Sequence, residues 1–116
     1  MGIPWLQAHA LRVGDHLIKR LAALMTRFPL VGDVRGLGLF LGVEMVNDRA
    51  HKGPATRQAW YVANRMKDGG VLMSTDGPFN NVLKSKPPMC FTLQDADFLV
   101  ETMARVLTED GAQPAP

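Results

Sequence analysis

Hydrophobic residues recur every three or four positions over residues 5–28, which is the spacing of one face of an α-helix. The apolar stripe comprises Val13, Leu17, Ile18, Leu21, Leu24, Met25 and Phe28. Pro29 ends the pattern, because the residue before a proline disfavours helical backbone. The pattern therefore predicts a long amphipathic helix, with Gly14 as a weak point inside it.

The hydrophobic period changes from about 3.6 to 2 over residues 31–46, which indicates strand. One face carries Leu37, Leu39, Leu41, Val43 and Met45, and the other carries Gly36, Gly38, Phe40, Gly42 and Glu44. The pattern fits one long strand, or a strand bent or broken into two around residues 36–38. Glycines on a strand face weaken it unless something packs closely against the backbone, so we expect such packing here.

Shorter patterns predict the remaining elements. A second helix is expected to open at residues 53–54 and to stop at residues 69–70. Residues 75–78 form a turn cluster. Short strands are expected at 71–74, 82–86 and 89–91.

The last helix is predicted to start at Thr92, because Asp95 three residues later makes an approximate capping box. The last residues, 110–116, have the sequence Asp-Gly-Ala-Gln-Pro-Ala-Pro, which predicts a disordered tail. The order of helices and strands has no strict βαβ repeat. It predicts an α+β fold, in which helices cover one face of a small mixed or antiparallel sheet.

Composition narrows the possible functions. A chain of 116 residues with 47% hydrophobic residues is expected to form one domain. Its net charge of +2 is too small to favour nucleic acid or an anionic membrane as a partner. A single cysteine excludes an internal disulfide framework, and the three histidines lack the spacing of metal ligands. No apolar run reaches the ~18 residues of a membrane span.

The most suggestive charged pair is Lys84 and Lys86. They lie two residues apart in a predicted strand, so both side chains share one face, where they could bind a phosphate or a carboxylate. The same spacing also fits an ordinary solvated strand face. Residues 36–42 superficially match a dinucleotide fingerprint, but the third glycine is one residue late and the glycines lie inside a strand. Close backbone packing is the better interpretation.

Several segments occur together in one order. They are Val31 to Glu44, Gly70 to Met73, Leu83 to Met89, and Thr92 with Asp95 and Asp97. This combination resembles the C-terminal small domain of class III aminotransferases, the fold-type I enzymes that use pyridoxal phosphate. The resemblance extends from about residue 6 to about residue 108. It implies a linker helix over 1–29 that leads to a missing large domain, a small domain over 30–109, and the tail over 110–116.

A finer similarity concerns Ser74 to Pro78 followed by Asn81 to Phe91. This stretch is similar to the phospholyase branch, which contains ethanolamine-phosphate phospho-lyase and 5-phosphohydroxy-lysine phospho-lyase. Transaminases of the family usually carry an arginine where Lys84 stands, and that arginine recognises a substrate carboxylate. Lysine lacks the bidentate fork that matches a carboxylate. The resemblance therefore implies a phosphate-bearing substrate, with Lys84 and Lys86 as candidate substrate-binding residues.

The resemblance also implies that the full-length parent uses pyridoxal phosphate as an electron sink. The lysine that holds the cofactor and the acidic partner of its pyridine nitrogen would lie in the missing large domain. No lysine of this chain matches the cofactor-lysine motif. We therefore assign no catalytic, cofactor-binding or metal-binding residue here, and we expect the chain alone to be inactive and to bind no cofactor.

Two other functions remain open. The chain could be part of a class III transaminase that acts on an ω-amino group, or a non-catalytic truncated isoform that binds full-length subunits. The resemblance implies a homo-oligomeric parent that is mitochondrial or cytoplasmic, and this chain shows no targeting segment. Separated from a large domain, the apolar stripe of the first helix would be exposed, so we expect self-association.

Overall fold

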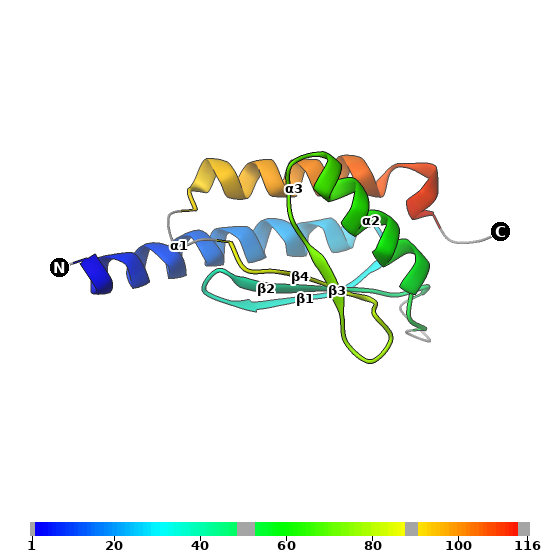
Figure 1. Cartoon of the computed structure of the whole chain (residues 1–116), viewed down its shortest axis with the longest axis horizontal. Helices are drawn as coiled ribbons and strands as arrows, with labels where there is room; N and C mark the ends of the chain where they lie inside the picture. The colour runs from blue at the N-terminus through cyan, green and yellow to red at the C-terminus, as the bar shows by residue number, and fades with distance from the viewer. Residues whose placement is uncertain (1, 49–52, 88–90, 114–116) are drawn as a thin grey trace.

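The computed structural model describes residues 2–48, 53–87 and 91–113. In chain order the elements are α1 (Gly2–Ala23), η1 (Leu24–Thr26), β1 (Val31–Leu37), β2 (Phe40–Met45), α2 (Thr56–Asp68), β3 (Ser74–Asp76), β4 (Val82–Ser85), α3 (Leu93–Leu107) and η2 (Asp110–Ala112). These strands form a sheet in the order β1-β2-β4-β3, with every neighbouring pair antiparallel. Figure 1 shows α1 and α3 together above the sheet. The predicted α+β fold is confirmed.

The glycine-rich stretch forms a hairpin of two strands. The pairing of β1 with β2 runs from Val31 opposite Met45 to Leu37 opposite Phe40, and the chain reverses at residues 38–39. Gly38 has a φ of +58°, a left-handed conformation that glycine adopts without steric penalty. Of the two alternatives left open by the sequence, the break into two strands is therefore confirmed.

Along β2 the two faces of the sheet differ as the period of two predicts. In β1 the predicted faces are wrong, because the hairpin turn places Gly36 opposite Leu41 and Leu37 opposite Phe40. Leu41, Val43 and Met45 are completely buried beneath the helices, and Leu83 of β4 joins them. On the opposite face of β2, Phe40 is exposed and Glu44 is half-buried. Helices α1 and α2 pack on the sheet, and α3 packs on both helices. We call the side beneath the helices the covered face and the other side the open face.

Helix α1 belongs to the core of this chain. Val13, Leu17 and Leu21 are completely buried in the same cluster as the sheet and α3. The expectation that the apolar stripe would be exposed is therefore wrong for these residues, because β1, β2 and α3 cover them. The helix approaches the hairpin so closely that a Cβ on Gly14 would lie 1.8 Å from the carbonyl oxygen of Gly38. The predicted close packing at the glycines is confirmed there, but it is wrong for Gly42, where a Cβ would meet one side-chain atom at the ordinary distance of 3.5 Å.

Some boundaries differ from the sequence predictions. Residues 71–73 precede β3, which starts at Ser74 because Ser74 is the residue that pairs with Lys84. Pro54 forms an isolated bridge with Val46, so α2 starts two residues later, at Thr56. Residues 88–90 lie outside the described residues, and Phe91 is not in a strand.

The ends of α3 combine one confirmed and one wrong prediction. The capping box is present, because Thr92 Oγ1 accepts the backbone N–H of Asp95 and the Asp95 carboxylate accepts that of Thr92, both at 3.0 Å. The prediction that residues 110–116 form a disordered tail is wrong for residues 110–113. Ala112 is 1% exposed, and the Gln113 amide donates to the backbone carbonyls of Leu107 and Glu109. Residues 114–116 lie outside the described residues. No described helix is long and apolar enough to cross a membrane.

Candidate functional site

The candidate lysine Lys84 lies on the open face of β4. In the register of the sheet it stands between Gly42 of β2 and Ser74 of β3. Its Nζ lies 2.8 Å from Oδ2 of Asp76, which comes from β3. The other carboxylate oxygen of Asp76 accepts the backbone N–H of Gly77 at 2.7 Å. Lys84 and then this backbone N–H hold the pKa of Asp76 below its usual value.

Lys84 and Lys86 line one open cavity of about 720 Å³. Its walls are residues 70–74, residues 84–87 and the first half of α3. The apolar lining comprises Val71, Leu72, Met73, Phe91, Phe98 and Leu99. Asp95, the third residue of α3 and a member of its capping box, adds a carboxylate. Lys86 itself is exposed beyond the end of β4. An apolar cavity with a few charged groups is typical of a small-molecule site.

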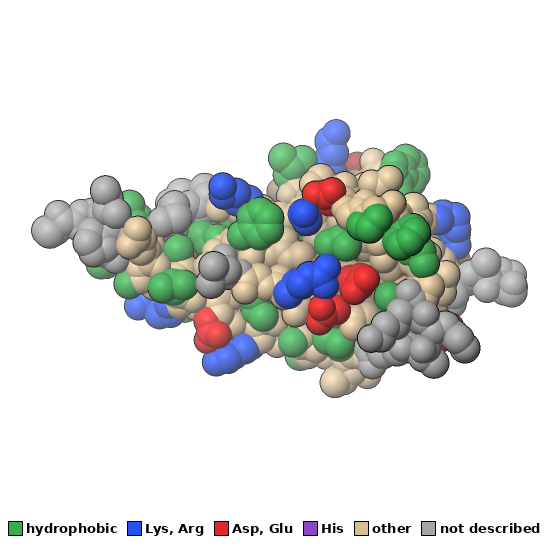
Figure 2. Space-filling view, turned by 90° about the horizontal axis from the view of Figure 1, so that it is seen from below, with side chains coloured by type: hydrophobic (Ala, Val, Ile, Leu, Met, Phe, Trp, Pro, Cys, Tyr) green, Lys and Arg blue, Asp and Glu red, His purple; other side chains and the backbone are tan. Residues whose placement is uncertain are grey.

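A second group of charges lies on the open face, outside the lining of this cavity. Arg35 of β1 has its Nη1 2.8 Å from Oδ2 of Asp33 and 3.7 Å from Oε1 of Glu44. Arg35 and Glu44 are nine positions apart in the sequence, and Asp76 and Lys84 are eight positions apart. The hairpin brings Arg35 to Glu44, and the β3–β4 pairing brings Asp76 to Lys84. Figure 2 shows Lys or Arg side chains next to acidic ones in the middle of this face.

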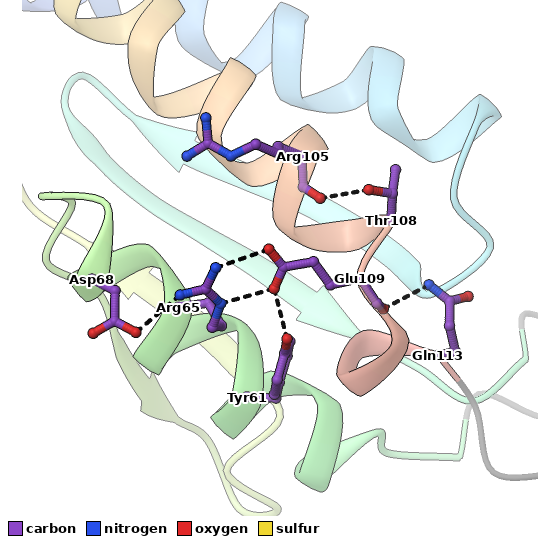
Figure 3. A network of polar contacts seen from close by, with 7 residues as sticks. All are labelled: Tyr61, Arg65, Asp68, Arg105, Thr108, Glu109 and Gln113. Atoms are coloured by element: carbon purple, nitrogen blue, oxygen red, sulfur yellow. Dashed lines mark hydrogen bonds and ion pairs between the residues drawn. The ribbon is translucent and has the colours of Figure 1, made fainter.

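A separate polar network ties α2 to the end of α3 (Figure 3). The carboxylate of Glu109 accepts hydrogen bonds from the Tyr61 hydroxyl at 2.6 Å, from Arg65 Nε at 2.8 Å and from Arg65 Nη2 at 3.0 Å. Arg65 also contacts Asp68 at 3.1 Å. The Arg65 guanidinium, followed by the Tyr61 hydroxyl, lowers the pKa of Glu109 to about 2. This network lies apart from the cavity, whose lining contains none of its residues.

The two helix histidines have structural partners. His9 Nε2 lies 2.8 Å from the carbonyl oxygen of Phe91, and His16 Nε2 lies 2.7 Å from the Asp97 carboxylate. His16 and then Arg20 hold the pKa of Asp97 below its usual value. These contacts join α1 to α3 and to Phe91, which precedes α3, so both histidines take part in packing between segments of the fold. Within residues 2–48, 53–87 and 91–113, no three His, Cys, Asp or Glu side chains are grouped to hold a metal ion.

Comparison with known proteins decides the family. A model of the aminotransferase class-III family matches residues 4–107. The chain belongs to the class III aminotransferase family. The resemblance inferred from the sequence motifs is therefore confirmed. Full-length members of the family depend on pyridoxal phosphate.

Curated relatives in this family carry two kinds of name. The chain is 49% identical over 98 residues to alanine–glyoxylate aminotransferase 2 homolog 2, mitochondrial, of Arabidopsis thaliana, covering 84% of this chain and 20% of that protein. It is 36% identical over 101 residues to ethanolamine-phosphate phospho-lyase homolog 1 of Caenorhabditis elegans, covering 86% of this chain and 22% of that protein. The chain thus spans about a fifth of the length of the curated relatives it matches.

Solved structures of the same family share the fold. A phospholyase from Arthrobacter, in complex with phosphoethanolamine, superimposes with a TM-score of 0.85 at 35% identity, covering 91% of this chain and 25% of that one. An omega transaminase from Pseudomonas jessenii in complex with PMP gives a TM-score of 0.79 at 30% identity, covering 90% and 23%. Both types of enzyme therefore contain this arrangement of helices and strands.

The described residues do not match a pyridoxal phosphate site. Such a site needs a lysine that can bond to the cofactor, an acid at the pyridine nitrogen and donors around the phosphate. Lys19 and Lys67 are exposed on helices, and Lys86 is exposed beyond β4. Lys84 is engaged with Asp76.

Proposed function

We propose that this chain is the C-terminal portion of a pyridoxal-phosphate-dependent phospholyase that eliminates phosphate from ethanolamine phosphate or 5-phosphohydroxy-lysine. In this proposal the remaining part of the same enzyme supplies the cofactor and its lysine, and Lys84 and Lys86 contact the substrate. The short span of this chain relative to its curated relatives supports a larger parent. The mitochondrial names of two relatives favour a mitochondrial parent over a cytoplasmic one.

The observation that carries the proposal is Lys84 at the cavity wall. A lysine ammonium is a compact point charge, whereas the arginine fork matches the two oxygens of a carboxylate. A phosphate monoester presents up to two negative charges and three acceptor oxygens, so it does not need a fork to bind a cation strongly. The phosphoethanolamine complex of the Arthrobacter phospholyase supports the same substrate class.

A transaminase is the second candidate, because the relatives at 49% and 50% identity are named as aminotransferases. The two candidates differ in their requirement for a keto acid. A phospholyase releases inorganic phosphate from a phosphorylated amine without an acceptor. A transaminase transfers the amino group only when a keto acid is present.

The test uses the intact native protein that contains this chain. It is captured with an antibody against residues 105–116 and its mass is measured. The captured protein is then assayed with pyridoxal phosphate for phosphate release from each substrate, and for amino transfer to a keto acid. Phosphate release without a keto acid supports the proposal. Keto-acid-dependent transfer without phosphate release overturns it in favour of the transaminase.

A native product of only 116 residues that binds no substrate would instead support the non-catalytic isoform. The decisive variant is Lys84→Gln in the intact enzyme, because it removes the positive charge. We expect it to retain the fold and to lose activity toward the phosphorylated substrate. Lys67→Gln, the same exchange at an exposed lysine of α2, is the matched control. Equal activity of both variants would show that the ammonium of Lys84 has no special role.

A further inference from the structure

The open face places a second cation opposite Lys84. Arg35 of β1, Gly42 of β2 and Lys84 of β4 stand in one row of the sheet register. With strands about 4.8 Å apart, the backbones of the two cationic residues are about 10 Å apart across the row. Both side chains are longer than half that distance, so their charged ends can approach one small group between them.

The middle residue of this row has no side chain. The backbone of Gly42 is buried between its neighbours, but a Cβ built on it would meet a single atom within 4 Å, Val82 Cγ1 at 3.5 Å. Any larger side chain would extend into the space between the arms of Arg35 and Lys84. Glycine at this position therefore leaves room between the two cations.

The acidic partners of the two cations lie in the neighbouring row, where Glu44 stands opposite Asp33 on one side and Val82 on the other. Asp76, the next residue of that row, also stands opposite Val82. The side chains of Arg35 and Asp76 are 56% and 58% exposed. Ion pairs this exposed contribute only ~0–1 kcal/mol. A more highly charged anion can therefore displace them.

We propose that Arg35 is a second anion-binding residue, which together with Lys84 binds the phosphate group of the substrate above Gly42. This inference rests on the proposed function and adds to it Arg35 and the open face above Gly42, which lie outside the lining of the cavity and share only Lys84 with it. The guanidinium of Arg35 can contact two phosphate oxygens and Lys84 the third. A phosphate dianion carries more charge and more acceptor oxygens than a monocarboxylate, so the two cations favour it over acetate.

The test is a titration of the 116-residue chain with phosphoethanolamine, followed by two-dimensional NMR at constant ionic strength. Ethanolamine and acetate are the comparison ligands. We expect Arg35→Gln and Lys84→Gln each to weaken phosphoethanolamine binding at least about fivefold, as expected for the loss of a charge-assisted hydrogen bond. Lys19→Gln is the matched control, because Lys19 forms an exposed ion pair with Asp15 on α1.

Gly42→Val adds a steric test. It should weaken phosphoethanolamine binding while its spectrum retains the dispersion of the folded chain. If Gly42→Val does not fold, Arg35→Gln and Lys84→Gln alone test the proposal. Loss of binding in Lys84→Gln together with unchanged affinity in Arg35→Gln overturns this inference and leaves the proposed function intact. Equal binding of acetate and phosphoethanolamine, or no binding by the unmodified chain, also overturns it, and the assay of the intact enzyme then decides the proposed function separately.

Discussion

The two faces of the sheet use the same residue types for opposite purposes. On the covered face, glycines allow close contact: Gly14 touches the hairpin backbone, and a Cβ on Gly36 would lie 2.8 Å from Ile18. On the open face, Gly42 leaves room beside two cations. A glycine in a strand can therefore either allow another segment to pack closely or leave space on an open face. Which of the two it does depends on whether another layer packs against it.

Charged groups show the same contrast. Above the covered face, Glu109 receives a bidentate contact from Arg65 and a further hydrogen bond from Tyr61, which locks α2 to α3. On the open face, Lys84 and Asp76 make a single exposed contact between adjacent strands. The first arrangement holds the fold together, whereas the second leaves its cation able to exchange partners.

The strongest test of the difference between the two faces is to shorten the side chains of two consecutive residues of β4, one on each face. Leu83 is completely buried on the covered face, whereas Lys84 is 38% exposed on the open face. We expect Leu83→Ala to lower the free energy of unfolding by about 2–5 kcal/mol, because it leaves a cavity. Lys84→Ala should hardly change it. Urea unfolding followed by circular dichroism measures both, and similar losses would show that the faces do not differ in packing.

The glycines give the next largest effect. Gly14→Ala should destabilise the chain by roughly 1–3 kcal/mol, because its Cβ meets backbone atoms that have little freedom to move. Gly42→Ala is the matched control, since its Cβ meets one side-chain atom at an ordinary contact distance. Thermal unfolding compares the two variants. A Gly14→Ala variant as stable as Gly42→Ala would contradict the close approach of α1 to the hairpin.

The helix network predicts a pH effect. The Arg65 guanidinium lowers the pKa of Glu109 to about 2 in the folded chain from its ordinary value of 4.5. A lowered folded pKa stabilises the fold above pH 4.5, and this stabilisation is lost as the pH falls toward 2. Glu109→Gln should be less stable at pH 7 and should lose less stability on acidification. Unfolding midpoints from pH 7 to pH 2.5 test this, and parallel profiles for the two proteins would exclude the network as a cause.

The smallest expected effect on stability is that of Asp76→Asn. The exchange removes the carboxylate that competes for Lys84, so we expect phosphoethanolamine affinity to rise about two- to fivefold with an almost unchanged unfolding midpoint. Asp15→Asn removes the partner of Lys19 and serves as the control. The NMR titration gives the affinity. A fall in affinity would mean that Asp76 holds Lys84 in its binding position instead of competing for it.

Local signals accounted for much of the fold. The helical period placed the buried positions of α1, and the period of two placed Leu41, Val43 and Met45 on the covered face. The capping box marked the start of α3. The tail was predicted wrongly because its contacts are not local: Arg57 and Gln58 of α2 both donate to the backbone carbonyl of Gln113.

The sequence by itself determined the family, the element types and the two candidate lysines, because these depend on residue types at short spacings. Only the tertiary structure decided which charges meet. Asp76 reaches Lys84, and Arg35 stands in line with it, because the strand order is β1-β2-β4-β3. The close contact of Gly14 with Gly38 likewise depends on how α1 crosses the hairpin. Such contacts join residues far apart in the chain, and neither periodicity nor motif spacing specifies a register between them.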